Sequence, residues 1–283
     1  MYSFLIPGGV YLKEDAVDRE LGAVMTIDHE APLLQGLWES VRSGQEEMLL
    51  SPYLPASYAF LMHVLLCAPF LALDALGTVS QRVRSWRIAA GSGPPPPLRR
   101  WWDCFWRLLY RYLTAVLPAT ALLHTVRSPA LPQLAPSCWQ LFVEVLACLL
   151  LFDTLFFMWH VFMHRVPWLY HNGHRLHHQH RTPFALAAQD SDPLELLSLL
   201  LLALSSAWVV GCHPLSEAVF HLCNSWLAVE DHCGYELPWA LHRLLPCLGG
   251  APYHQAHHTL QKVNFAPYFI HWDVLFGTYR GPA

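Results

Sequence analysis

Charged residues are scarce in this chain of 283 residues: Asp, Glu, Lys and Arg make up 13% of it, about half the share of an ordinary soluble domain. Hydrophobic residues reach 54% and the mean hydropathy is +0.28, so the charges are too few to cover a soluble globule of this size. The 17 basic residues are scattered and the net charge is −4, which excludes the basic surface that nucleic-acid binding needs. We therefore expect a membrane protein with no nucleic-acid partner.

Several chemical motifs are also missing. The eight cysteines include no CxxC pair, the spacing of many redox and zinc sites, which indicates reduced packing residues. No GxGxxG sequence is present, so the chain carries no dinucleotide-binding module of its own. Disorder is excluded by 12 Trp, 14 Phe and 11 Tyr residues, because such a composition can bury a core.

Long apolar stretches are present, and four of them approach the roughly 20 residues that a membrane crossing needs. These stretches are residues 58–76, 108–126, 140–163 and 194–212. A fifth, residues 214–229, is short and contains Glu217, His221 and Asn224, so a re-entrant helix and a full crossing both stay open. Arginines and a Pro-rich segment at 91–97 lie between the first two stretches, which indicates a cytosolic linker there.

Histidine is concentrated in the second half of the chain, where 15 of the 18 residues lie at or after His160, against about 8 for an even spread. Most belong to three motifs: His160-x-x-x-His164, His174-x-x-His177-His178 and His254-x-x-His257-His258. Positions i, i+3 and i+4 share one face of a helix, so each motif is expected to point its imidazoles at a single locus. Eight donors exceed the four of a structural zinc site, which favours two metal ions.

The type of ligand does not select the metal, because imidazole suits iron, zinc and copper alike. A zinc hydrolase normally places a carboxylate base beside its ligands, as in HExxH, whereas the intervening pairs here are Arg175-Leu176 and Gln255-Ala256. A bis-histidine haem protein needs only paired axial ligands and would leave the doubled histidines unused. The redox chemistry of oxygen at two irons is the natural use that remains.

The three histidine motifs, which follow hydrophobic spans, resemble those of the membrane fatty acid hydroxylase and sterol desaturase superfamily. The likeness covers residues 50–283, and its cholesterol-hydroxylating members are similar to this chain at WHVFMHRVPWLY, HRLHHQHRTPFALAAQ, SWLAVEDHCGYELPWALHRL and NFAPYFIHWDVLFGT. The resemblance implies an O2-dependent monooxygenase with two Fe ions that hydroxylates cholesterol, a membrane lipid. Zinc can replace the iron on purification. The fold implied with the spans is all-α, a polytopic integral membrane helical bundle with a cytosol-facing histidine-rich metal-binding cap.

The resemblance implies nine metal ligands, carried over position by position. They are His160, His164, His174, His177, His178, His232, His254, His257 and His258. Two positions depart from the family pattern: Cys233 stands where serine is usual, and Asp190 where a larger, less polar residue is usual. Candidates for supporting the ligands from outside are Asp153, Asp231 and His242. No separate catalytic acid or base is required, and no substrate-binding residue is assigned.

The expected organisation is a non-membrane N-terminal segment over residues 1–54, transmembrane helices with the Pro-rich linker over 55–163, and a fatty acid hydroxylase-type catalytic domain over 140–283. The resemblance also implies an endoplasmic reticulum membrane address and electrons from an NADPH-dependent reductase, with or without cytochrome b5. Three alternatives stay open: a C4-methylsterol oxidase, a fatty acyl hydroxylase, and a non-catalytic membrane metal-binding or transport protein.

Overall fold

The computed structural model describes residues 33–88, 94–127 and 130–281. Within these ranges the chain forms helices and no strand beyond isolated bridges, which confirms the predicted all-α class. Two short helices, α2 (Gln35–Arg42) and α3 (Glu46–Leu49), come first. Residues 1–32 of the expected N-terminal segment and residues 89–93 of the expected linker lie outside the described residues.

Three of the described helices are long and apolar enough to cross a membrane: α4 (Leu54–Val79), α8 (Cys138–Arg165) and α10 (Pro193–Val210). They match three of the four predicted spans. Ser137 caps α8 by accepting a hydrogen bond from the backbone N–H of Gln140 at 3.1 Å, which satisfies one donor of the first turn. Gly211, with φ of +71°, ends α10 in the left-handed conformation that glycine adopts at low cost.

The fourth predicted span, residues 108–126, lies in a helical run made of α6 (Leu98–Arg111), the π-helical turn η2 (Tyr112–Val116) and α7 (Leu117–Val126). The turn ends two residues before Pro118, which has no N–H to donate to the carbonyl four residues earlier. The wider π turn accommodates this missing bond. The fifth stretch forms α11 (Pro214–His232).

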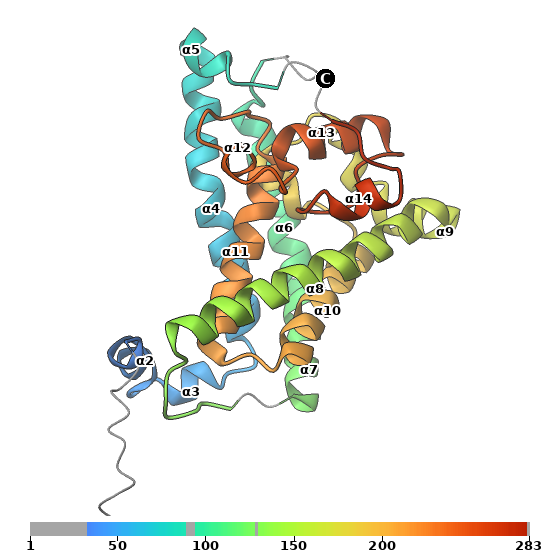
Figure 1. Cartoon of the computed structure of the whole chain (residues 1–283). Coiled ribbons are helices and arrows are strands. Elements are labelled where there is room, and N and C mark those ends of the chain that lie inside the picture. The colour runs from blue at the N-terminus through green and yellow to red at the C-terminus, as the bar shows by residue number, and fades with distance from the viewer. Residues whose placement is uncertain (1–32, 89–93, 128–129, 282–283) are drawn as a thin grey trace, which may run out of the picture.

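Helix α11 occupies the centre of the bundle. It packs against α4, α8 and α13 (Gly250–Leu260), and α8 crosses obliquely in front of it (Figure 1). Phe70 and Tyr112 belong to the core on the α4 side, and Phe152 and Phe220 to the core on the α8 side. Apolar packing therefore holds α11 on two faces.

Short helices gather at one end of the bundle, which we call the cap. Figure 1 shows α12 (Leu241–Leu244), α13 and α14 (His271–Leu275) there, and α2 and α3 at the opposite end. The remaining short elements are α5 (Gln81–Arg84), α9 (Pro167–Leu169), η3 (Tyr170–His174), η4 (His177–Gln179) and η5 (Ala185–Gln189). The three histidine motifs all lie in or next to the cap.

A buried polar network fixes the cap end of α4. Asp74, which is 3% exposed, accepts hydrogen bonds from the Trp101 indole at 3.0 Å and the Tyr235 hydroxyl at 2.7 Å. Arg87 lies 3.2 Å from the same carboxylate. A carboxylate in an apolar bundle needs such partners to offset its lost hydration. The network therefore holds α4 against α6 and against the segment that follows α11.

We expect Asp74→Ala to lower the free energy of unfolding by about 3 kcal/mol, because the Arg87 guanidinium would stay buried without its partner. Unfolding of the detergent-solubilised protein, followed by circular dichroism, measures the change. Asp103→Ala is the matched control, since its ion pair with Arg99 is largely exposed and is worth less than about 1 kcal/mol. Equal losses in the two variants would contradict the role given to Asp74.

Candidate metal centre

Nine histidine side chains converge in the cap and form two clusters. The first cluster is His160, His164, His174, His178 and His257, and the second cluster is His177, His232, His254 and His258. Within each cluster the candidate ligand atoms lie within 4.8 Å of one another. The structure therefore brings together all nine histidines that the family resemblance implies as metal ligands.

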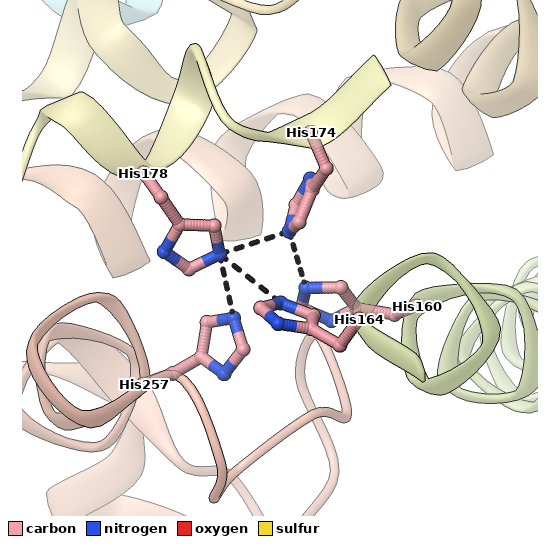
Figure 2. Close-up of side chains that lie close together, drawn as sticks. All are labelled: His160, His164, His174, His178 and His257. Atoms are coloured by element: carbon pink, nitrogen blue, oxygen red, sulfur yellow. Dashed lines mark hydrogen bonds between the residues drawn. The ribbon is translucent and has the colours of Figure 1, made fainter. Parts of the chain in front are cut away.

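The first cluster is built from three segments (Figure 2). His160 and His164 lie one turn apart on α8, His174 and His178 come from the segment after it, and His257 comes from α13. Their Nε2 atoms face one another: His160 to His174 at 2.9 Å, His174 to His178 at 2.9 Å, His164 to His178 at 3.1 Å, and His178 to His257 at 3.2 Å.

The second cluster lies beside the first and is also assembled from three segments. His177 belongs to η4, His232 is the last residue of α11, and His254 and His258 are one turn apart on α13. The Nε2 atom of His232 lies 3.1 Å from that of His177 and 3.0 Å from that of His254, and His254 lies 3.1 Å from His258. All four side chains are buried.

The prediction that each motif points at a single locus is wrong for the two HxxHH motifs. His174 and His178 belong to the first cluster, whereas His177 belongs to the second. On α13, His254 and His258 belong to the second cluster, and His257 belongs to the first. Successive residues of a helix point about 100° apart, so neighbouring histidines diverge. Each motif therefore supplies both clusters and ties them together.

Hydrogen bonds at the outer ring nitrogens set the direction of the lone pairs. Three rings donate from Nδ1 to a backbone carbonyl: His160 to Phe265 at 2.6 Å, His232 to Ala228 at 2.7 Å, and His257 to Val263 at 2.7 Å. A carbonyl only accepts, so in these neutral rings the proton is on Nδ1 and Nε2 carries the lone pair. Two rings of the first cluster and one ring of the second thus direct an Nε2 lone pair inward, an arrangement that a cation would satisfy.

Burial keeps the imidazoles of the cap in the form that binds metal. It lowers the pKa of His257 to about 4 and, with the neighbouring His257 and His164 rings adding to the effect, the pKa of His178 to about 2. Both rings are therefore neutral at pH 7, and their nitrogens are free of competing protons.

Glu195 is a site residue that the sequence analysis missed. Its side chain is 2% exposed near the start of α10, and Oε1 lies 3.0 Å from Nδ1 of His174. Carboxylates in this position orient metal-binding histidines and raise their basicity. On the other cluster, Ser191 Oγ lies 3.3 Å from Nδ1 of His177. The signal available in the sequence was an acidic residue inside a Leu-rich membrane span, where a carboxylate is costly.

The three predicted supporting residues are Asp153, Asp231 and His242, and the structure gives each of them different surroundings. Asp153 accepts hydrogen bonds from the backbone N–H groups of Tyr268 and Phe269, both at 3.0 Å. His242 packs over the first turn of α13, and Asp231 is buried beside His232. Among the described residues, none of these three makes a hydrogen bond to a histidine of either cluster. Asp153 instead anchors the segment that follows α13.

The first departure from the family pattern lies outside both clusters. The Cys233 thiol is 3.4 Å from the carbonyl oxygen of Tyr235, and burial raises its pKa, so it stays protonated. Gly234 next to it has φ of +75°, and a Cβ there would be 2.8 Å from the carbonyl oxygen of Pro183. Only glycine allows this close backbone approach.

The second departure, Asp190, is a buried anchor. Its carboxylate is 2.6 Å from both Arg107 and Arg111 of α6 and 2.9 Å from His180. Burial opposes ionisation, but the hydrogen bonds from His180 and Arg107 outweigh it and hold the pKa of Asp190 below its ordinary value. These contacts fix the segment between the second histidine motif and α10.

A cavity of about 1290 Å³ extends from the clusters through the bundle, large enough for a lipid-sized molecule. At the cap end its lining includes members of both clusters: His160, His174, His177, His232 and His254. Trp38 and Met48 line the opposite end, near α2 and α3. The arrangement can therefore present one end of a long apolar molecule to both histidine clusters.

Comparison with known proteins agrees with this geometry. A family model described as "Fatty acid hydroxylase" matches residues 145–278. Cholesterol 25-hydroxylase of Rattus norvegicus is 45% identical over 251 residues, covering 88% of this chain and 83% of the rat protein. The Homo sapiens protein of the same name is 43% identical over 250 residues, covering 87% and 90%.

A methylsterol monooxygenase of Aspergillus fumigatus is 32% identical over 240 residues, covering 79% of this chain and 76% of the fungal protein. No solved structure matches. The resemblance inferred from the histidine motifs is thus confirmed over most of the chain.

We expect Glu195→Ala to weaken metal binding about 10- to 100-fold, because His174 would lose the carboxylate that orients it. Competition between the purified protein and a metal chelator measures the affinity. Glu195→Gln keeps an acceptor oxygen and should retain most of it, and Glu47→Ala, on exposed α3, should retain all of it. Unchanged affinity in Glu195→Ala would show that other contacts position His174.

Proposed function

The chain belongs to the fatty acid hydroxylase family, together with the cholesterol 25-hydroxylases, and we propose that it is an O2-dependent sterol monooxygenase that converts cholesterol to 25-hydroxycholesterol. One observation carries the proposal: two clusters of converging imidazole nitrogens lie at the end of a long, mainly apolar cavity. Such a site can bind a redox-active metal pair and a membrane lipid at the same time.

We assign one iron ion to the first cluster and a second to the second cluster. Bound iron supplies the activation of O2 that oxidation of an unactivated C–H bond requires. Imidazole nitrogens alone do not distinguish iron from zinc, so the assignment of iron rests on the family. Zinc in purified material is then a substitute for iron.

The residues of the chain orient the histidine rings and exclude water from the site. The backbone carbonyls of Phe265, Ala228 and Val263 hold three ligand rings in the tautomer that faces inward. Glu195 and Ser191 orient two more rings. The apolar cavity wall excludes water from the reacting carbon, and no side chain needs to act as a separate acid or base.

Electrons come from a separate protein in this proposal, because the sequence has no dinucleotide-binding motif. We propose a membrane-bound NADPH-dependent reductase, with or without cytochrome b5. Three apolar helices support a membrane location. The arginines between α4 and α6 support a cytosolic cap, and the sterol substrate supports the endoplasmic reticulum.

A second candidate function is oxidation of a methylsterol, which the Aspergillus fumigatus relative favours. It uses the same metal centre and differs in the part of the sterol that reaches the clusters. The carbon that acquires oxygen therefore separates the two functions.

In a host without sterol hydroxylation, cholesterol feeding under ¹⁸O2 should give ¹⁸O-labelled 25-hydroxycholesterol. His177→Ala and His257→Ala should each lower the product by at least about 100-fold, because each removes a ligand from one cluster. His171→Ala, a neighbouring exposed histidine outside both clusters, should retain the activity of the parent. Mass spectrometry of the extracted sterols measures the product.

Equal product from the parent and both ligand variants would overturn the assigned site. Product from a methylsterol but none from cholesterol would favour the second candidate function.

A further inference from the structure

The end of the cavity far from the clusters contains a polar group, which consists of Arg127, Glu217 and His221 and is called here the distal polar group. All three residues line the cavity. Arg127 donates two hydrogen bonds to the Glu217 carboxylate, both at 3.2 Å, and His221 Nε2 lies 3.8 Å from Glu217 Oε1. The carboxylate keeps lone pairs free, and His221 has a ring nitrogen available. The group can therefore both accept a hydrogen bond and donate one.

Helix α11 sets the distance between this group and the metal positions. His232 of the second cluster is the last residue of α11, and His221 precedes it by eleven residues, or about 16 Å along the axis. Glu217 lies one turn further, about 22 Å from His232. These spans are comparable with the length of a sterol from its ring hydroxyl to the end of its hydrocarbon tail.

The cavity between the two ends is mainly apolar. Its wall includes Phe156 of α8 and Leu200 and Ala203 of α10. Asn224 is a polar exception, but its side-chain oxygen already accepts a hydrogen bond from the Tyr268 hydroxyl at 2.9 Å. A hydroxyl placed against this wall would lose its hydration without compensation. A sterol ring system, by contrast, needs no polar partner there.

Polar atoms also line the cap end of the cavity: Glu195 belongs to its wall, and Oε1 of Glu195 lies 3.0 Å from Nδ1 of His174. A hydroxyl bound there would place the sterol rings at the clusters, whereas the proposed hydroxylation requires the end of the hydrocarbon side chain there. The distal polar group is therefore the end of the cavity that suits the hydroxyl.

We propose that the distal polar group binds the 3-hydroxyl of the sterol, which donates to Glu217 and accepts from His221. The substrate then lies tail-first, with the end of its hydrocarbon side chain at the two clusters and its first ring near the start of α11. This inference deepens the proposed function and rests on it: α11 determines which carbon reaches the metals.

The test first compares two sterols, one with and one without the 3-hydroxyl, and then compares variants of the protein. Binding of tritiated cholesterol to the purified full-length protein in nanodiscs is competed with unlabelled cholesterol or with cholest-5-ene, which lacks the 3-hydroxyl. The parent should bind cholest-5-ene about tenfold more weakly, the effect of one or two lost hydrogen bonds. In Glu217→Ala and in His221→Phe, each of which removes one partner of the hydroxyl, this preference should fall to about threefold or less.

Glu144→Ala is the matched control. Glu144 lies at the same end of the bundle, where it accepts a hydrogen bond from the backbone N–H of His213 at 3.1 Å, and it is not part of the cavity wall. This variant should keep the full preference for cholesterol. In turnover, the two distal variants should raise KM for cholesterol by about tenfold with a smaller change in kcat, because they weaken binding of the substrate far from the reacting carbon.

Equal binding of the two sterols by the parent overturns the hydroxyl site, and so does a preference that persists in both distal variants. If either variant fails to fold, as shown by size-exclusion chromatography, the parent's comparison of the two sterols still decides. A parent that prefers the hydroxyl-bearing sterol but forms no oxysterol refutes the proposed function and supports the site. A parent that hydroxylates cholesterol without such a preference refutes the site alone.

Discussion

Convergence of nine imidazole nitrogens on two points is the constraint on which the rest of the structure depends. Backbone carbonyls fix the outer nitrogens of His160, His232 and His257 as donors, so the inner lone pairs face one another. A cation at the centre of each cluster would satisfy inner nitrogens that lie 2.9–3.2 Å apart. Because the histidines come from α8, the η3–η4 segment, α11 and α13, metal bound at the two clusters would join four parts of the chain and contribute to their folding.

Buried carboxylates position the segments around this centre. Glu195 orients a ligand ring, Asp190 ties the segment before α10 to two arginines of α6, and Asp153 holds the segment after α13 through two backbone N–H groups. A carboxylate is expensive in an apolar bundle, and each of these is stabilised by named partners. These three buried carboxylates therefore hold the segments that carry or flank the histidine clusters.

Much of this organisation could be predicted from the sequence, because membrane thickness and ligand spacing are strong physical limits. Hydrocarbon thickness predicts the lengths of α4, α8 and α10, and the histidine motifs identified eight of the nine converging residues, with His232 added by the family resemblance. The division of each HxxHH motif between two clusters could not be predicted. It depends on the directions of adjacent residues and on the π and 3₁₀ turns at η3 and η4.

Two further features could not be predicted because they depend on contacts between segments that are far apart in the sequence. Glu195 is 21 residues from His174 in the chain, and only the packing of α10 brings them together. Arg127 and Glu217 are separated by 90 residues. Sequence periodicity describes one helix at a time, so it does not predict contacts between different helices.

The most direct test of the metal-centred account is an anomalous-difference map from crystals of the iron-loaded protein, collected at the iron edge. The account predicts two peaks, one among His160, His164, His174, His178 and His257, and the other among His177, His232, His254 and His258. A single peak shared by the two clusters, or peaks away from both, would contradict it.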